Sequence, residues 1–341
     1  MLLSLGPGLS SAPEGWILVV QLPGFKIVDK VKHINSVYAE THKGVGGVSL
    51  VGGCSAFDFV GTTESEILLG KLSPISIDAV GTSRLLNDVH HAAYGDGRIA
   101  VANSGCDSIE MFSESLEHLE TKPLIPLFKP SLRYSFNVLK HQVSRSIRRS
   151  LSSYGASYSH FSSKARWANL RKWINPKRVG FPGKDMREID MRPHFLHPNH
   201  VSFQEGEFLI TMLRPGVQMS LSGGDRVWSN LARPHDGIVV GGRTVFTECA
   251  TSCLAVGETL NDFKRYSIVP DGKHGFVRGI AVNDDFYVVG LSALRGKDRV
   301  PLARISLLCR ERGDIRETWS VPEEYGRQVY SVVDVTEHYL S

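Results

Sequence analysis

Four polar residues occupy equivalent places in four similar stretches of the sequence. Each stretch consists of polar residues, a short strand-like run, a turn rich in Gly, Asp or Asn, and a second strand. Alignment on the turn superposes His91, His200, Asp236 and Arg278. When repeats are arranged around an axis, their equivalent positions meet in space. We therefore expect two imidazoles, a carboxylate and a guanidinium to form one constellation, although they are far apart in the chain.

The residue before each aligned position is a second candidate. These preceding residues are His90, Asn199, His235 and Val277. Adjacent side chains on a strand point to opposite faces, so one residue of each pair should face the axis. In the first pair the alignment favours His91, with His90 packed between neighbouring sheets. His235 and Asp236 are equal candidates, as are His197 and His200.

A constellation of this composition supports two kinds of chemistry. Imidazoles with a carboxylate suit zinc, iron or manganese, whereas carboxylate and carbonyl oxygens suit calcium. A divalent metal would polarise a carbonyl group or lower the pKa of a bound water. Without a metal, a neutral His would act as general base while Arg278 holds an anionic group. The predicted metal ligands are His91, His200, His235 and Asp236, and the predicted catalytic residues are His91, His200, His235 and Arg278.

A simpler interpretation of the same residues stays open. Polar side chains at the starts of strands can cap loops and satisfy backbone groups near an axis without binding any ligand.

The spacing of the repeats predicts a β-propeller. The last two steps between aligned residues are 36 and 42 residues, and the first is 109 because an insert interrupts it. Units of about 40 residues with several short strands are typical of propeller blades. Val48–Val51, Ala56–Val60 and Glu66–Leu72 form an earlier blade, and Tyr330–Val335 with Trp16–Leu22 would close the ring and remove open sheet edges. The strands suffice for five or six blades, and we predict six in a single all-β domain of residues 1–341.

Two groups of short motifs resemble known propellers. The run from Gly95 to Phe112 resembles an NHL-type blade. Pro198-Asn199-His200 and Arg233-Pro234-His235-Asp236-Gly237, with Arg192-Pro193, are similar to strand starts in the six-bladed propellers of the gluconolactonase and senescence-marker-protein type. The resemblance covers about four blades, roughly half of the chain.

The resemblance implies a metal-dependent hydrolase. In that superfamily Asn, Asp, Glu and His residues at such strand starts hold a divalent metal on the axis. This sequence has no clear counterpart of the family's N-terminal Glu ligand, and its corresponding positions are richer in His. These departures favour a softer metal than calcium, or no metal.

A strongly basic insert separates the first aligned stretch from the second. From Thr121 to Lys184 there is no Asp or Glu, yet there are fourteen Lys or Arg residues. The rest of the chain has 25 basic and 35 acidic residues, so the net charge of +4 combines an acidic body with a basic insert. Such an insert predicts an anionic partner, such as a phospholipid surface, a polyanionic glycan, nucleic acid or a phosphorylated substrate.

We predict an inserted basic helical subdomain over residues 125–180. Apolar residues recur every three to four positions from Leu132 to Leu151 and again from Trp167 to Ile174, which is typical of helices with one apolar face. The predicted anion or membrane contacts are Arg145, Arg148, Arg149, Arg171 and Lys172. Basic amphipathic helices with Trp suit a membrane interface. A lid packed on the propeller and a gate for an anionic substrate are alternatives, and nucleic acid is unlikely because no nucleic-acid module is recognisable.

Composition limits the class of protein. Apolar residues make up 42% and charged residues 22%, as in soluble globular proteins. Five scattered Cys residues argue against a disulfide scaffold and for a reducing compartment. The N-terminal residues lack the pattern of a signal peptide, and no run approaches 18 uninterrupted apolar residues. We therefore expect a cytoplasmic protein with peripheral membrane contact as a further option.

These patterns lead to two functional hypotheses. The first is a propeller enzyme that acts at the axial mouth on a small or glycan-like anionic substrate, through metal-assisted hydrolysis, lactone opening or lyase chemistry. The alternative is a non-catalytic propeller that binds a ligand or partner and uses the basic insert to dock on a membrane surface or polyanion. About one equivalent of metal in the purified protein would favour the enzyme.

The insert yields a first testable prediction. Charge reversal at Arg145, Arg148 and Arg149 should abolish binding to anionic vesicles or to a polyanion. Raising the salt concentration should weaken that binding steeply, because exposed charges are screened over about 8 Å at physiological ionic strength. Vesicle co-sedimentation over a salt series measures both effects. Partitioning that does not depend on salt, or no partitioning, would instead favour the lid.

Overall fold

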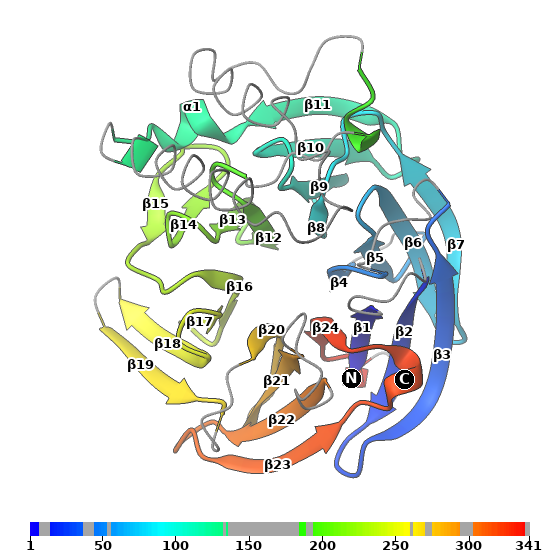
Figure 1. Ribbon diagram of the computed structural model, residues 1–341, viewed down its shortest axis with the longest axis vertical. Coiled ribbons are helices and arrows are strands. Elements are labelled where there is room, and N and C mark those ends of the chain that lie inside the picture. The colour runs from blue at the N-terminus through cyan, green and yellow to red at the C-terminus, as the bar shows by residue number, and fades with distance from the viewer. Residues whose placement is uncertain are drawn as a thin grey trace, which may run out of the picture.

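The computed structural model describes residues 1–6, 14–36, 44–52, 56–131, 134–135, 184–188, 194–259, 262–269, 275–293 and 303–337. These residues form an all-β propeller of six four-stranded antiparallel sheets around a central axis (Figure 1). The prediction of a six-bladed propeller is therefore confirmed, and the five-bladed alternative is excluded.

The six sheets are numbered here as blades, each given from its innermost to its outermost strand. Blade 1 contains β24 (Gln328–Val333), β1 (Leu2–Gly6), β2 (Glu14–Gln21) and β3 (Lys26–Ile34). Blade 2 contains β4 (Val48–Leu50), β5 (Phe59–Thr62), β6 (Glu66–Leu72) and β7 (Ile75–Thr82). Blade 3 contains β8 (Val89–Gly95), β9 (Arg98–Asn103), β10 (Ser108–Ser113) and β11 (His118–Pro123).

The remaining three blades follow the same order. Blade 4 contains β12 (Pro198–Gln204), β13 (Glu207–Met212), β14 (Val217–Ser220) and β15 (Arg226–Trp228). Blade 5 contains β16 (Pro234–Val240), β17 (Arg243–Glu248), β18 (Cys253–Thr259) and β19 (Asp262–Ser267). Blade 6 contains β20 (Phe276–Val282), β21 (Phe286–Ser292), β22 (Arg304–Cys309) and β23 (Ile315–Ser320). A 3-10 turn, η2 (Glu323–Tyr325), leads from blade 6 to β24.

Strands from both ends of the chain close the ring. The C-terminal strand β24 pairs antiparallel with the N-terminal strand β1, with Leu2 opposite Val333 and Leu3 opposite Val332. Both chain ends therefore lie in blade 1 (Figure 1). This pairing satisfies the backbone groups of β1 that would otherwise form an open sheet edge.

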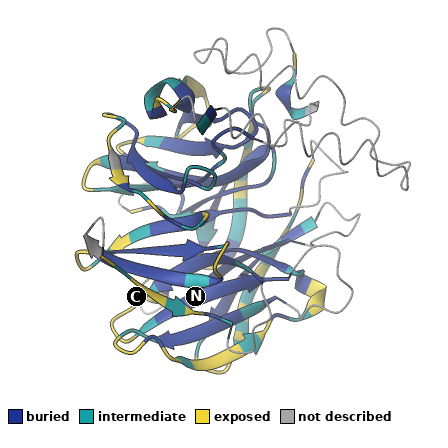
Figure 2. Cartoon of the chain, turned by 60° about the vertical axis from the view of Figure 1, so that its left-hand side comes forward, coloured by how far each residue is buried: buried dark blue, intermediate teal, exposed yellow. Residues whose placement is uncertain are grey.

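The residue pattern of each strand follows its distance from the axis. Inner and middle strands pack on neighbouring blades through both faces, so they are apolar almost throughout; every residue of β1 is buried. Outer strands have one face in water and alternate, as β3 does along its length. Figure 2 shows the buried strands inside and the exposed residues at the outer rim. Between blades 1 and 6, for example, Leu3 and Leu18 belong to the same buried cluster as Ile305.

Five of the six innermost strands share an irregularity that shapes the axis; β4 pairs in regular register. The pairing register shifts between Val89 and His91 in β8, Pro198 and His200 in β12, Pro234 and Gly237 in β16, and Arg278 and Ile280 in β20. Strand β24 has a matching shift opposite Ser4 and Leu5. Such β-bulges leave one or two residues unpaired and redirect the neighbouring side chains. The strict alternation assumed for these strands therefore fails where each of them begins.

The basic insert begins and ends between blades 3 and 4. After β11 the chain forms α1 (Leu124–Phe128), whose Leu124, Ile125 and Phe128 are buried in the core shared by these blades. The helix ends at Lys129, which has a left-handed φ of 49°. Near the other end of the insert is η1 (Met186–Glu188), where the buried Met186 donates its N–H to the carbonyl oxygen of Arg84 at 2.7 Å.

Most of the predicted helical subdomain falls outside the described residues. This applies to residues 136–180 and to the predicted contacts Arg145, Arg148, Arg149, Arg171 and Lys172. Within the described residues, no helix reaches the length and hydrophobicity that a membrane-spanning helix needs.

Candidate functional site at the axial mouth

The aligned residues lie on the innermost strands of four consecutive blades. His91 is on β8, His200 on β12, Asp236 on β16 and Arg278 on β20. All four side chains are buried, with at most 9% of their surface exposed. The innermost strands run side by side around the axis (Figure 1), so these residues form an arc near the mouth at which the strands begin.

His91 and His200 form a buried pair of imidazoles. Their ring centroids are 4.1 Å apart. Burial and then the neighbouring His200 hold the pKa of His91 well below its ordinary value. Burial lowers the pKa of His200 to about 4, although Asp236 opposes the shift. Both rings are therefore neutral at pH 7, and Nδ1 of His200 has no hydrogen-bond partner among the described residues.

Blade 2 contacts His91 through the Ser49 hydroxyl, which lies 3.5 Å from Nε2 of His91, and through the backbone of Gly47. A Cβ atom on Gly47 would lie 2.1 Å from Cδ2 of His91, and the Gly47 N–H donates to the carbonyl oxygen of His90 at 2.8 Å. Only glycine allows this approach, which explains the Gly46-Gly47 pair at the start of β4.

Asp236 links blade 5 to blade 6. Its Oδ2 accepts hydrogen bonds from the Thr247 hydroxyl at 2.7 Å and from the Gly279 N–H at 2.8 Å. Nδ1 of His235 lies 3.3 Å from each carboxylate oxygen. Burial alone would raise the pKa of Asp236, but the neighbouring His235 holds it well below its ordinary value, with help from the hydrogen bond of Thr247. Asp236 is therefore an ionised anchor that orients His235.

Arg278 is a buried cation with unused donors. It is 9% exposed, and its guanidinium lies over the rings of Tyr330 at 5.1 Å and Phe276 at 5.4 Å. Among the described residues, Nε and Nη1 of Arg278 and the hydroxyl of Tyr330 have no hydrogen-bond partner. An unpaired buried charge is costly, so this arrangement is suited to an anion supplied from outside.

A second polar group at the mouth was not predicted. Ligand atoms of Asp88, His90 and His197 all lie within 4.8 Å of one another, so this group could bind a metal ion. His90 was expected to pack between sheets, but its ring lies 4.7 Å from that of His197 and 5.9 Å from that of His235. The bulge explains the difference, because the pairing register skips His90 and so breaks the alternation of faces on which the expectation rested.

None of the predicted metal ligands belongs to this group. His91, His200, His235 and Asp236 lie beside it, and within the described residues their ligand atoms do not converge in the same way. Asp88 precedes β8 with a left-handed φ of 51°, and the register shift next to it breaks the alternation of faces, so the sequence spacing gives no signal for this group.

The carboxylate of Asp107 holds the loop that carries His197. It accepts three successive backbone N–H groups, from Phe195 at 3.0 Å, Leu196 at 2.7 Å and His197 at 3.0 Å. Asp107 lies in the β9–β10 turn with a left-handed φ of 52°. Sequence patterns gave no indication of this role, because the three donors are about 90 residues away from Asp107.

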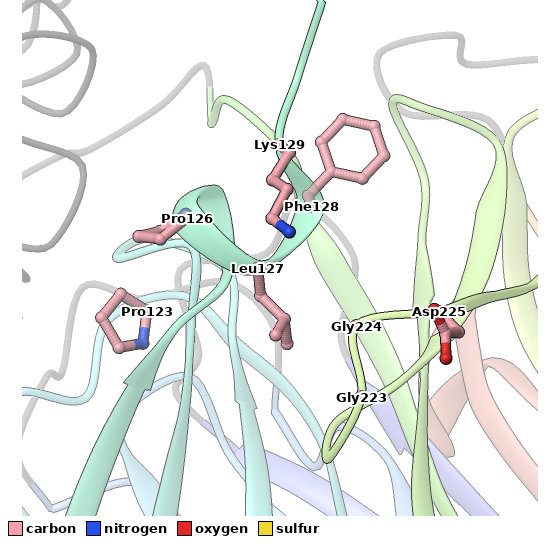
Figure 3. Close-up of a pocket in the computed structure, with 8 residues that line it drawn as sticks. All are labelled: Pro123, Pro126, Leu127, Phe128, Lys129, Gly223, Gly224 and Asp225. Atoms are coloured by element: carbon pink, nitrogen blue, oxygen red, sulfur yellow. The ribbon is translucent and has the colours of Figure 1, made fainter.

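A separate groove of about 710 Å³ lies between α1 and the β14–β15 turn (Figure 3). Its lining consists of Pro123, Pro126, Leu127, Phe128, Lys129, Gly223, Gly224 and Asp225. None of the axial residues lines this groove.

Comparisons with known proteins support the fold. No protein-family model matches the chain, and no curated protein matches it. Among solved structures, a chain of a nidogen/laminin complex matches with 11% identity, 98% coverage of both chains and a TM-score of 0.55. A protein of unknown function from Bacteroides caccae matches with 10% identity, 98% coverage of both chains and a TM-score of 0.53. At this identity the matches show a shared propeller fold and no narrower superfamily.

The Asp107 contacts yield a stability prediction. In Asp107→Asn the amide nitrogen replaces one carboxylate oxygen, so at least one backbone N–H of the 195–197 loop faces a donor. The free energy of unfolding should fall by about 1.5–3 kcal/mol, the usual contribution of a hydrogen bond to a charged group. Asp96→Asn is the matched control, because Asp96 has the same left-handed φ but is exposed in the β8–β9 turn. Equal urea midpoints for the two variants would contradict the role of Asp107.

The buried His pair predicts how stability depends on pH. The unfolded state binds a proton on His200 below about pH 6.5, whereas the folded state does so only near pH 4. Stability should therefore fall as pH decreases through this window, by about 3 kcal/mol from His200 alone. His200→Gln should flatten the dependence of the unfolding free energy on pH between 4 and 6.5.

His118→Gln is the matched control for this experiment. The hydrogen bond with Glu110 raises the pKa of His118. The stability that protonated His118 contributes is therefore fully present below pH 6.5 and is lost as pH rises above it. The control should leave the slope between pH 4 and 6.5 unchanged. An unchanged slope in His200→Gln would show that His200 is not held neutral.

Proposed function

We propose that the axial mouth is an active site for a small anionic substrate. The observation that carries this proposal is the buried guanidinium of Arg278, whose Nε and Nη1 have no protein partner among the described residues. A planar guanidinium with free donors matches a carboxylate, sulfate or phosphate group. Arg278 stacks on the ring of Tyr330, whose unpartnered hydroxyl supplies a further donor.

His235 is the best candidate for the general acid or base. The ionised carboxylate of Asp236 holds a proton on Nδ1 of His235 and fixes the His235 ring. A carboxylate in this position activates a catalytic imidazole. His91 and His200 supply neutral rings beside it. A bound anion would favour the protonated form of a nearby imidazole, so the substrate itself would bring the pKa of His200 closer to neutrality. These groups suit proton abstraction next to an anionic group, as in lyase chemistry.

Metal-assisted hydrolysis or lactone opening is the second route that the mouth offers. It would use the Asp88, His90 and His197 group to activate a water. The similarity of the strand starts to gluconolactonase-type propellers agrees with this route, and membership of that superfamily is part of the proposal.

The place of the basic insert supports an anionic substrate. Met186 docks on the backbone of Arg84, and Asn87 donates a side-chain hydrogen bond to the Met186 carbonyl oxygen, directly before Asp88. On leaving the insert the chain also enters the loop of His194 and His197. A segment with an excess of basic residues attached at this mouth would raise the local concentration of anions.

Arg278 provides the test of the proposed site. Arg278→Gln should bind inorganic phosphate, sulfate or a small carboxylate about tenfold to hundredfold more weakly, because a charge-assisted hydrogen bond contributes about 1.5–3 kcal/mol. Isothermal titration of chelator-treated protein measures this change. The variant should be at least as stable as the original protein, since it removes an unpaired buried charge.

Arg312→Gln is the matched control, because Arg312 is an exposed cation paired with Asp314. Equal anion affinities in Arg278→Gln and the control would contradict the proposed site. Anion binding that depends on Arg278, without turnover of any small acid or lactone, would favour the non-catalytic alternative.

A further inference from the structure

The inference concerns the second polar group at the mouth, formed by Asp88, His90 and His197 in blades 3 and 4. We propose that these three residues are the ligands of a divalent transition metal, with His194 as a positioning residue. The site is distinct from the anion subsite at Arg278, and it does not depend on that subsite.

The donor set determines the class of metal. Two imidazole nitrogens and one carboxylate oxygen are typical of catalytic zinc sites and of mononuclear iron(II) sites, which keep positions open for water or substrate. Calcium and magnesium prefer sites built from oxygen ligands. The ligand atoms lie within 4.8 Å of one another, so a single ion can contact all three after small side-chain movements.

His194 connects two of the three ligands. Its Nε2 lies 3.0 Å from Oδ2 of Asp88, and its Nδ1 lies 2.5 Å from Nδ1 of His197. The contact between the two rings is a hydrogen bond in which either Nδ1 can be the donor. When His197 donates from Nδ1, the lone pair of its Nε2 would be available to a metal.

A neighbouring side chain in contact with the ring, as His194 is with His197, is usual for metal-binding imidazoles. A ligating His commonly donates its other N–H to a neighbouring acceptor, which fixes the tautomer and the orientation of the ring. His194 is 2% exposed, and the Asp107 carboxylate fixes the backbone that follows it. The loop is therefore held in place by groups that are not themselves ligands.

His235 lies on the side of the metal group from which a ligand held at Arg278 would approach. The ring of His235 lies 5.9 Å from that of His90, across from blade 3, and its neighbour Asp236 binds the N–H of Gly279 next to Arg278. The metal group, His235 and Arg278 thus follow one another around the mouth. A ligand held at Arg278 by its anionic end would extend past His235 toward the metal.

Metal binding to the full-length protein tests this proposal directly. After chelator treatment, Zn²⁺ should bind with a stoichiometry of one and raise the melting temperature, because it binds the folded state selectively. Bound Co²⁺ should give the visible ligand-field absorption that is typical of a cobalt ion with a low coordination number. Asp88→Asn and His197→Gln should abolish the stoichiometric binding of both ions.

Three further variants separate a metal site from a structural cluster. His194→Gln should weaken Zn²⁺ binding about tenfold to hundredfold and shift the Co²⁺ spectrum, because it removes the side chain that orients the ring of the ligand His197. Arg278→Gln should leave Zn²⁺ affinity unchanged, so the failure of the anion site and of the metal site can be told apart. His33→Gln is the matched control, because His33 is also paired with a carboxylate, that of Glu66 at 2.8 Å, but lies in outer strand β3.

Two outcomes would overturn the proposal. One is Zn²⁺ affinity that is unchanged in folded Asp88→Asn and His197→Gln protein, with folding verified by circular dichroism without metal. The other is loss of Zn²⁺ binding in His200→Gln but not in Asp88→Asn, which would assign the metal to the His91, His200, His235 and Asp236 set.

Discussion

Every axial residue depends on the pairing of β24 with β1. This pairing closes the ring and brings the innermost strands to the distance at which their first residues touch. In an open sheet, polar residues at strand ends would be solvated. In the closed ring His91 and Asp236 are almost completely buried. Burial holds the pKa of His91 well below its ordinary value, whereas the neighbouring His235 lowers the pKa of Asp236 against the effect of burial. The electrostatics of the site therefore follow from closure.

Burial also determines how the charges at the mouth are balanced. Asp236 has partners from three directions, whereas the guanidinium of Arg278 is stacked on two rings and retains two free donors. The cost of burying a charge is offset only when hydrogen bonds complete its environment. The hydrogen bonds are therefore complete around Asp236 in blade 5 and incomplete at Arg278, and the proposed function rests on this difference.

The sequence was sufficient for the fold and for the strands on which four of the axial residues lie. Repeat spacing and turn residues predict the propeller, its closure by both chain ends, and the placement of His91, His200, Asp236 and Arg278 on successive innermost strands. It could not predict the bulges, because a bulge is a shift of pairing register that leaves the pattern of apolar residues intact. For that reason His90 was assigned to packing. The role of Asp107 was also hidden, since its partners are brought close only by the ring.

The two groups at the mouth have complementary chemistry. Asp88, His90 and His197 provide lone pairs, which suit a cation, whereas Arg278 provides unused N–H donors, which suit an anion. A cluster that served stability alone would gain most if these groups neutralised each other, because an unpaired buried charge is costly. Instead they are in different blades, with His235 and the ionised Asp236 between them. In the proposed function, a ligand with an anionic end and a second polar group would bridge the two groups and satisfy both at once.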